Sequence, residues 1–374
     1  MKKLGFGLMR LPQLEADNYA KVDIETTKKM ADSFMANGFT YFDTAAPYHQ
    51  GNSEVAFREA VVKRYPRTAY TITDKLSLFM IQQAEDMSSF FEGQLERLGL
   101  DYIDYYLLHG LGEPTYQKAE NFHAFQFIQE LKAQGKVKHI GLSFHDKAAL
   151  LDEILTKHPE MEYVQIQLNY LDWEDSTVES RKCYEIATKH RKPVIVMEPI
   201  KGGSLVNIPD EATKCFAAVR PELSAASWAI RFAATPDNIM IVLSGMSDEA
   251  QMEDNISYMK NFEPLNETEQ NAVSKAAEII KNSIFIPCTG CRYCIDDCPM
   301  KIAIPDYFAI YNNLKRFGAK QAMVAMTYYG NLTQTHGKAS DCVKCGKCEE
   351  LCPQHLPIRR FLEDVTAALE SGAD

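Results

Sequence analysis

The chain alternates between short apolar runs and longer amphipathic segments, and it does so eight times before residue 262. The short runs have the length and the Val, Ile, Leu and Tyr content of buried strands, whereas the longer segments have helical spacing. The strand-length runs are Leu4–Met9, Thr40–Asp43, Tyr70–Lys75, Ile103–His109, Val137–Ser143, Tyr163–Leu168, Val194–Met197 and Ile239–Leu243. The helical segments lie at 24–37, 53–64, 82–98, 119–134, 146–156, 178–190, 222–234 and 248–261. Because parallel strands need crossover helices, we predict an α/β fold with a parallel sheet.

Eight such units in series predict a closed (β/α)8 barrel, a fold of ~250 residues. The alternative is an open, doubly wound sheet, which carries a glycine-rich phosphate turn after its first strand. The segment Gly5–Arg10 lacks the third glycine of that turn, and this favours the barrel. Catalytic side chains of such barrels lie at the C-terminal ends of the strands.

The composition narrows the class of protein. Of the 374 residues, 46% are hydrophobic and 24% are charged, which is typical of a folded domain and not of a disordered or fibrous chain. The net charge of −11 argues against a nucleic-acid partner. No window approaches the ~18 apolar residues of a membrane span. The short N-terminal apolar run has no cleavage site after it, and we expect a cytoplasmic protein.

Three successive predicted strands end in residues that suit catalysis. Asp43 ends the second strand, Lys75 the third and His109 the fourth, and Tyr48 lies in the loop after the second. An ammonium close to a phenol favours the phenolate and lowers the pKa of the tyrosine. Taken singly, the aspartate has a structural alternative as a helix cap, and the histidine as a packed core residue. Their position at consecutive strand ends predicts an active site.

The segment Asp43–Glu54, together with the lysine and the histidine downstream, resembles the aldo-keto reductase family, and the likeness covers residues 1–262. The resemblance implies a catalytic tetrad made of Asp43, Tyr48, Lys75 and His109. In this tetrad the tyrosine donates a proton, the lysine and aspartate support it, and the histidine orients a carbonyl oxygen. The resemblance also implies NADPH or NADH as cofactor and a small-molecule carbonyl or alcohol as substrate, because no side chain can supply a hydride.

The same resemblance assigns the cofactor to the remaining strand ends. Ser143 and Gln165 match residues that bind the nicotinamide carboxamide, although Phe144 replaces the asparagine of the family. Met197 stands where the family stacks an aromatic ring on the nicotinamide, and Lys201 either binds the pyrophosphate or is a solvated loop residue. The family segment that binds the adenosine phosphate is matched here by Ser244, Gly245, Gln251 and Asn255. The matching segment of this chain lacks the Lys or Arg that selects a 2′-phosphate, so the choice of cofactor stays open.

Eight of the ten cysteines lie in the last 90 residues. They form the runs Cys288-x2-Cys291-x2-Cys294-x3-Cys298-Pro299 and Cys342-x2-Cys345-x2-Cys348-x3-Cys352-Pro353. This is the pattern of bacterial two-cluster ferredoxins, in which the fourth cysteine of each run binds the other cluster. We predict one [4Fe–4S] cluster on Cys288, Cys291, Cys294 and Cys352, and a second on Cys342, Cys345, Cys348 and Cys298. Zinc sites, the alternative, usually show separated cysteine pairs.

These patterns divide the chain into a barrel at 1–265, a linker helix at 266–284 and a dicluster ferredoxin-like domain at 285–374. The 43 residues between Cys298 and Cys342 are many for a compact ferredoxin. Helices are predicted at 306–316 and 319–329, with a break near Phe317-Gly318. This part of the chain resembles the α-helical ferredoxins of electron-transfer subunits, which implies a redox partner protein.

The sequence therefore predicts an iron–sulfur aldo-keto reductase, and two alternatives stay open. One is an electron-transfer protein that connects nicotinamide, with or without a flavin, to a redox partner. The other is a nicotinamide-binding redox sensor, against which Tyr48 argues because sensing needs no proton donor. Three residues are candidates for lining the substrate pocket, namely His49, His145 and Trp173.

Overall fold

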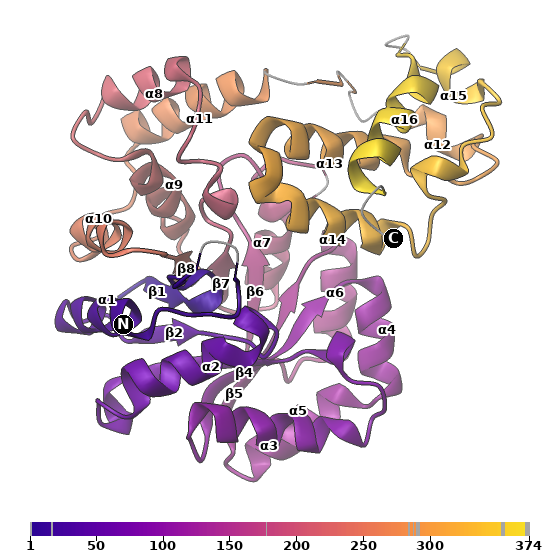
Figure 1. The fold of residues 1–374 in the computed structure, drawn as a ribbon. Coiled ribbons are helices and arrows are strands. Elements are labelled where there is room, and N and C mark those ends of the chain that lie inside the picture. Colours follow the sequence, from indigo (N-terminus) through magenta and orange to yellow (C-terminus); the bar gives the residue numbers. More distant parts are fainter. Residues whose placement is uncertain are drawn as a thin grey trace.

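Eight parallel strands close into a barrel in the order β1 to β8 (Figure 1). The structure is a computed structural model that describes residues 2–15, 18–176, 178–282, 285–286, 288, 292–352 and 356–370. The strands are β1 (Leu4–Gly7), β2 (Tyr41–Asp43), β3 (Thr71–Leu76), β4 (Ile103–Leu111), β5 (Val137–Phe144), β6 (Tyr163–Gln167), β7 (Val194–Met197) and β8 (Ile239–Gly245). The closing pair joins β1 to β8. The predicted barrel is confirmed, and the open sheet is wrong for this chain.

Both faces of the strands are buried, which explains why the strand runs are apolar almost without interruption. The barrel interior is filled by large side chains from five of the strands, namely Tyr41, Leu107, Tyr163, Ile195, Ile241 and Leu243. The outer faces of the strands pack against the surrounding helices in a larger apolar cluster. The strand ends are therefore held by a rigid scaffold, which fixes the side chains that follow them.

Helices surround the barrel close to the predicted positions (Figure 1). They are α1 (Ile24–Ala36), α2 (Asn52–Phe57), α3 (Asp86–Leu98), α4 (Glu113–Asn121), α5 (Ala124–Ala133), α6 (Ala148–Lys157), α7 (Ser180–Lys189), α8 (Asp210–Ala217), α9 (Ala225–Ala234) and α10 (Glu249–Met259). Local signals set their ends: the Asp23 carboxylate accepts a hydrogen bond from the Thr26 amide at 3.0 Å, which caps α1. Two helices, α4 and α8, have no counterpart among the predicted segments. The short α8, at 8 residues, is too brief for a clear helical period.

The C-terminal region is helical, as predicted. Helix α11 (Glu267–Lys281) starts at a capping box of Asn266 and Glu269 and packs its apolar face on α8 and α9. The remaining helices are α12 (Tyr293–Asp296), α13 (Ile304–Phe317), α14 (Ala322–Leu332), α15 (Lys347–Glu350) and α16 (Ile358–Leu369). Gly318, with φ 65, separates α13 from α14 at the predicted break. No helix in the described part of the chain is long and apolar enough to cross a membrane.

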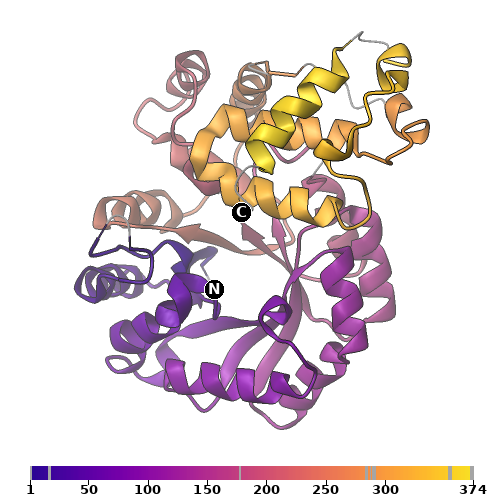
Figure 2. The ribbon, with the colours of Figure 1, turned by 45° about the vertical axis from the view of Figure 1, so that its right-hand side comes forward.

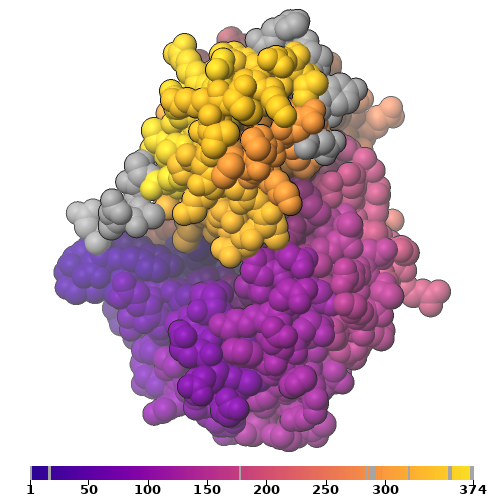
Figure 3. Space-filling model, turned by 90° about the vertical axis from the view of Figure 1, so that its right-hand side faces the viewer, coloured from indigo at the N-terminus to yellow at the C-terminus, as the bar shows by residue number. Residues whose placement is uncertain are grey.

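The C-terminal helices lie against the barrel (Figures 2 and 3), and their side chains reach the C-terminal ends of β5, β6 and β7. An ion pair between Lys147 and Asp306, at 3.7 Å, connects the loop after β5 to α13. Three side chains of the C-terminal region also donate hydrogen bonds to the barrel: Tyr328 to Gln167 Oε1 at 3.2 Å, Asn331 to the His145 carbonyl at 3.4 Å, and Gln321 to the Lys201 carbonyl. The cysteine-bearing region therefore covers one side of the barrel mouth.

Candidate active site and cysteine cluster

The four residues of the predicted tetrad come together at the mouth of the barrel. Asp43 ends β2, Lys75 lies in β3 and His109 lies in β4. The Lys75 ammonium donates hydrogen bonds to Asp43 Oδ1 and to the Thr44 carbonyl, each at 2.6 Å. It also lies 4.8 Å from the centre of the Tyr48 ring. The ring of His109 meets that of Tyr48 edge to face, with the centres 6.0 Å apart.

Burial and charge set the protonation of the lysine–aspartate pair. Lys75 is 1% exposed and Asp43 is 3% exposed, so each needs the other's charge. Burial by itself lowers the pKa of Lys75, but the Asp43 carboxylate outweighs it, and the pKa lies above its ordinary value. The lysine is therefore a fixed cation under the tyrosine.

Tyr48 differs from the sequence expectation. Burial raises its pKa to about 12, although the Lys75 ammonium pulls in the opposite direction. The prediction that the lysine brings the pKa below its ordinary value is therefore wrong for this structure, because loss of hydration outweighs the nearby charge. The phenol consequently carries its proton at neutral pH, and this is the form that can donate it.

His109 is held as a neutral ring. Its Nδ1 atom lies 2.7 Å from the Ser77 hydroxyl, which fixes the ring orientation. Burial, assisted by the charge of Lys75 and by His145, holds the pKa of His109 well below its usual range. A neutral ring with Nδ1 engaged leaves Nε2 to interact with a substrate oxygen.

The residues expected at the nicotinamide have unused hydrogen-bonding capacity. Gln165 is 2% exposed, and its Oε1 atom has no hydrogen-bond partner within the described residues. The Ser143 hydroxyl accepts a hydrogen bond from the Gly110 amide at 2.7 Å, so its own proton stays available. Met197, at the end of β7, is partly exposed. A carboxamide offers an N–H donor for the Gln165 oxygen and a carbonyl acceptor for the Ser143 hydroxyl. These residues therefore fit the carboxamide of a nicotinamide.

The residues expected at the cofactor phosphates are arranged differently. Lys201, 2% exposed, forms an ion pair with Asp172 at 2.5 Å, and so its charge is already compensated inside the protein. Asn255 donates to the Ser244 hydroxyl at 2.7 Å, and Gln251 Oε1 accepts a hydrogen bond from the Ser247 amide at 3.0 Å. Gly245 lies at the end of β8, directly beneath the side chain of Arg10.

The three candidate pocket residues separate in the structure. His145 lies at the edge of the mouth with its ring 6.1 Å from that of Tyr328, and burial lowers its pKa to about 4. His49 is fully buried and stacks on the Tyr19 ring with centres 4.3 Å apart. The Trp173 ring packs between Tyr184 and Phe232. His145 lies close enough to the tetrad to lower the pKa of His109, whereas His49, which follows Tyr48 in the chain, directs its ring to Tyr19.

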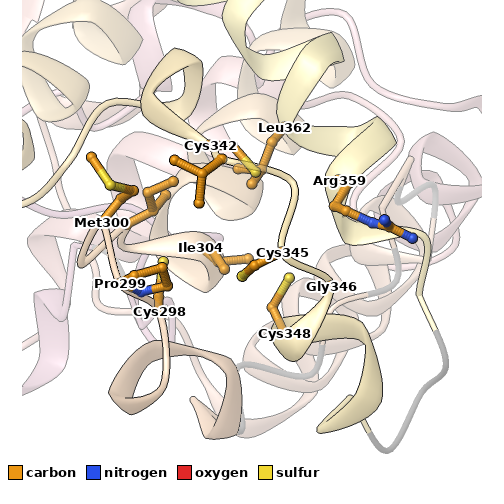
Figure 4. Close-up of a pocket in the computed structure, with 12 residues that line it drawn as sticks. Cys298, Pro299, Met300, Ile304, Cys342, Cys345, Gly346, Cys348, Arg359 and Leu362 are labelled. Atoms are coloured by element: carbon orange, nitrogen blue, oxygen red, sulfur yellow. The ribbon is translucent and has the colours of Figure 1, made fainter.

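Four of the predicted cluster ligands surround one pocket in the C-terminal region (Figure 4). Its lining includes Cys298, Cys342, Cys345 and Cys348, the set expected for the second cluster. Gly346, with φ 83, allows the tight turn between two of these cysteines. No three His, Cys, Asp or Glu side chains of the described residues are arranged to hold a single metal ion.

The chemistry of this pocket suits an iron–sulfur cluster. Burial, the Glu349 carboxylate and the other thiols raise the pKa of Cys348 to about 11, so four thiolates would require a positively charged group between them. Thiolates are the ligands that iron–sulfur clusters prefer. Of the ligands predicted for the first cluster, Cys294 and Cys352 are buried and Cys288 is partly exposed, while Cys291 lies outside the described residues.

Comparison with known proteins identifies both parts of the chain. A family model described as the aldo/keto reductase family matches residues 3–278. The chain belongs to the aldo/keto reductase family. A second model, described as a 4Fe-4S dicluster domain, matches residues 287–356. The protein is thus an aldo/keto reductase domain followed by a 4Fe-4S dicluster ferredoxin domain.

The relatives of this aldo/keto reductase are distant. An aldo-keto reductase of Mycobacterium sp. (strain KMS) is 31% identical over 120 residues, which are 32% of this chain and 41% of that protein. The NADH-specific methylglyoxal reductase of Escherichia coli (strain K12) is 26% identical over 152 residues, 36% of this chain and 45% of that protein. The chain therefore spans less than half the length of these two curated relatives.

Solved aldo-keto reductases share the barrel. The holo form of the Bacillus halodurans enzyme has a TM-score of 0.58 and 22% identity, and the match covers 73% of this chain and 91% of that one. The Klebsiella pneumoniae enzyme in complex with NADPH has a TM-score of 0.58 and 18% identity over 73% and 90% of the two chains. Both matches establish the fold that the two proteins share with this chain.

A buried network behind the tetrad of this aldo/keto reductase was missed by sequence reasoning. Glu54 is fully buried and forms an ion pair with Arg97, while Gln94 donates to the Lys75 carbonyl at 3.1 Å. Asp74, also buried, accepts a hydrogen bond from the Lys75 amide at 2.8 Å. The sequence feature that indicates this network is the polar run Thr73-Asp74-Lys75 inside an apolar strand. Buried polar side chains need polar partners, so such a run predicts further polar residues packed around the strand.

Proposed function

We propose that the protein interconverts a small-molecule carbonyl and an alcohol with NADPH or NADH. The observation that carries this proposal is the buried Lys75–Asp43 ion pair under Tyr48, with His109 beside it. The orphaned Gln165 oxygen supports a nicotinamide at the same mouth. When bound, the reduced nicotinamide would supply a hydride to the carbonyl carbon.

The side chains of the mouth would supply the matching proton. The protonated phenol of Tyr48 donates its proton to the substrate oxygen, which becomes the alcohol hydroxyl. Lys75 stabilises the phenolate that is left, and Asp43 keeps the lysine charged and in place. The neutral ring of His109 donates a hydrogen bond from Nε2 to the same oxygen when the Ser77 hydroxyl donates to Nδ1. Ser143 and Gln165 would hold the carboxamide, with Met197 against the nicotinamide ring.

We assign two [4Fe–4S] clusters to the C-terminal domain. Cys298, Cys342, Cys345 and Cys348 would bind one of them, which the pocket of Figure 4 supports. The other would bind Cys288, Cys291, Cys294 and Cys352, as the spacing of the two runs implies.

A turnover assay tests the proposal directly. Anaerobically purified protein is mixed with simple aldehydes and with NADH or NADPH, and the absorbance of the reduced cofactor is followed. We expect aldehyde-dependent oxidation of at least one of the two cofactors. Oxidation of neither cofactor across aldehydes and ketones would contradict carbonyl reduction and favour a sensor.

A second candidate function is electron exchange between the nicotinamide and the clusters. It is favoured by the contact of the cysteine-bearing domain with the barrel mouth, where Tyr328 donates to Gln167. A hydride carries two electrons and each cluster normally takes one, so an additional redox group such as a flavin would divide the pair. Electron paramagnetic resonance after NADH or NADPH addition tests this. If the clusters stay oxidised during aldehyde turnover, electron exchange is contradicted and the clusters have a structural role.

A further inference from the structure

We propose that Arg10 is the residue that binds the cofactor pyrophosphate, with Glu198 holding its guanidinium in position. This inference rests on the proposed function, because it assigns a phosphate ligand to the nicotinamide site. It transfers to Arg10 the role that the sequence suggests for Lys201.

Arg10 lies across three neighbouring strand ends. It follows β1 directly, in the short turn Leu8–Arg10. Its side chain covers Gly245 at the end of β8, where an added Cβ atom would lie 3.1 Å from Arg10 Cδ. Its Nη2 atom lies 3.7 Å from Oε1 of Glu198, just after β7. The guanidinium is therefore placed between the strand ends that the resemblance gives to the cofactor.

The surroundings leave this guanidinium accessible. A cavity of 420 Å³ opens beside it, lined by Met9, Arg10, Leu11, Pro12, Gln13, Tyr19, Ser247 and Met323. The side chain of Arg10 is 34% exposed. Its backbone is fixed, because the Ser247 hydroxyl donates to the Arg10 carbonyl at 2.8 Å. The backbone of Arg10 is thus fixed, while its side chain stays partly exposed beside the cavity. This combination suits an arginine that binds a ligand.

Glu198 is suited to orient the arginine and leaves it free to bind a second anion. At 3.7 Å the contact is longer than a hydrogen bond. The other oxygen of Glu198, Oε2, is buried and has no hydrogen-bond partner within the described residues. A guanidinium has five N–H donors, so it can face a carboxylate on one edge and phosphate oxygens on another.

The other basic side chains of this region are already paired. In the described loops after β1, β7 and β8, the lysines and arginines are Arg10, Lys21 and Lys201. Lys201 is buried against Asp172 at 2.5 Å, and Lys21 is bound to Glu15 at 2.6 Å. A pyrophosphate that leaves water requires a cation to balance its negative charge. Of these three basic residues, Arg10 has the longest ion pair, at 3.7 Å from Glu198.

The test measures binding of NADH, NADPH and ADP-ribose to wild-type protein and to Arg10→Ala, by calorimetry. ADP-ribose contains the pyrophosphate without the nicotinamide. We expect Kd to rise roughly 10- to 100-fold for all three ligands, the size typical of a lost charge-assisted hydrogen bond. Arg10→Lys should give a smaller loss, because lysine keeps the charge but not the paired donors. An equal loss for NADH and NADPH distinguishes the pyrophosphate from a 2′-phosphate.

Arg64→Ala is the matched control, since Arg64 is 32% exposed and pairs with Asp32 far from the mouth. It should bind all three ligands like the wild type and have similar thermal stability to the Arg10 variants. Wild-type affinity for ADP-ribose and NADH in Arg10→Ala would overturn the inference and leave the proposed function intact. A loss confined to NADPH would also overturn it. Wild-type protein that binds neither NADH nor NADPH would overturn the proposed function itself.

Discussion

At the scale of single residues, the tetrad shows how burial changes the chemistry that a sequence pattern suggests. The positions of Asp43, Lys75 and His109 follow from strand ends alone. Their protonation does not, because burial raises the pKa of Tyr48 to about 12 despite the lysine beside it. The sequence located these groups, but their titration depends on how much water the folded mouth excludes.

The phenol of Tyr48 is the first residue-scale test. Tyr48→Phe keeps the ring and removes the proton donor, so the rate of carbonyl reduction should fall by roughly 10²- to 10⁴-fold. Cofactor binding should stay unchanged, because the hydroxyl is not among the groups assigned to the cofactor. Steady-state kinetics and a Kd measured by fluorescence separate the two effects. A variant with wild-type turnover would show that another group donates the proton.

His145 gives a pH-dependent test. Burial lowers its pKa to about 4 in the folded protein, whereas an unfolded histidine titrates near ~6.5. As the pH falls from ~6.5 towards 4, the unfolded chain takes up the proton first, so folding stability is lost across this window. The loss from this residue is on the order of 3 kcal/mol.

Urea unfolding of wild type and His145→Gln at several pH values, followed by the fluorescence of the buried Trp228, measures the effect. The variant should lose less stability than the wild type between pH ~6.5 and ~4. Parallel curves for the two proteins would mean that His145 does not carry this pH dependence.

At the scale of elements, the break between α13 and α14 decides where the C-terminal domain meets the barrel. Gly318 has φ 65 and ψ −157, a conformation that is nearly restricted to glycine. The break turns the chain so that Gln321 reaches the loop after β7 and Tyr328 reaches the last residue of β6. A continuous helix through this point would carry α14 away from the barrel mouth.

Gly318→Ala should therefore lower the free energy of unfolding of this region by about 1–3 kcal/mol. Space is not the cause, since nothing lies within 4 Å of an added Cβ atom there. Gly330→Ala in α14 is the matched control, because its Cβ also meets open space while its helical backbone should gain up to ~1 kcal/mol. Thermal melting of both variants measures the difference. Equal stability of the two would show that the positive φ carries no strain.

At the scale of the whole molecule, the protein places a helical cysteine domain beside the active-site mouth of a barrel. Hydrogen bonds from Tyr328 and Asn331 reach residues at the ends of β6 and β5, and Figure 2 shows the C-terminal helices beside the barrel. The contact brings the domain's helices within reach of the tetrad's own neighbours, including His145.

The iron content tests the assignment of two clusters to the C-terminal domain. Protein purified without oxygen should hold about eight iron atoms per chain, as two [4Fe–4S] clusters require. Cys345→Ala should reduce this to about four, because the other cluster keeps its own ligands. Cys215→Ala is the control, since Cys215 lies in α8 and should leave the iron unchanged. Zinc in place of iron would contradict the assignment.

The sequence alone determined the features that depend on residues close together in the chain. Strand and helix periods gave eight βα units, strand ends gave Asp43, Lys75 and His109, and cysteine spacing gave the dicluster domain that comparison confirms. These signals are local, because backbone periodicity and ligand spacing are set within a few residues. The short helices α4 and α8 were not predicted from the sequence, because about two turns are too few to show a helical period.

Only the tertiary structure decided the pairings between distant segments. Lys201 was expected either to bind the pyrophosphate or to lie in solvent, yet folding buries it against Asp172, 29 positions away. Arg10 and Glu198, 188 positions apart in the sequence, meet because β1 and β7 both flank β8 in the closed barrel. Charges find partners through space, and burial then fixes their protonation. Neither the loose pairing of Arg10 with Glu198 nor the proton on Tyr48 can therefore be deduced from the order of residues.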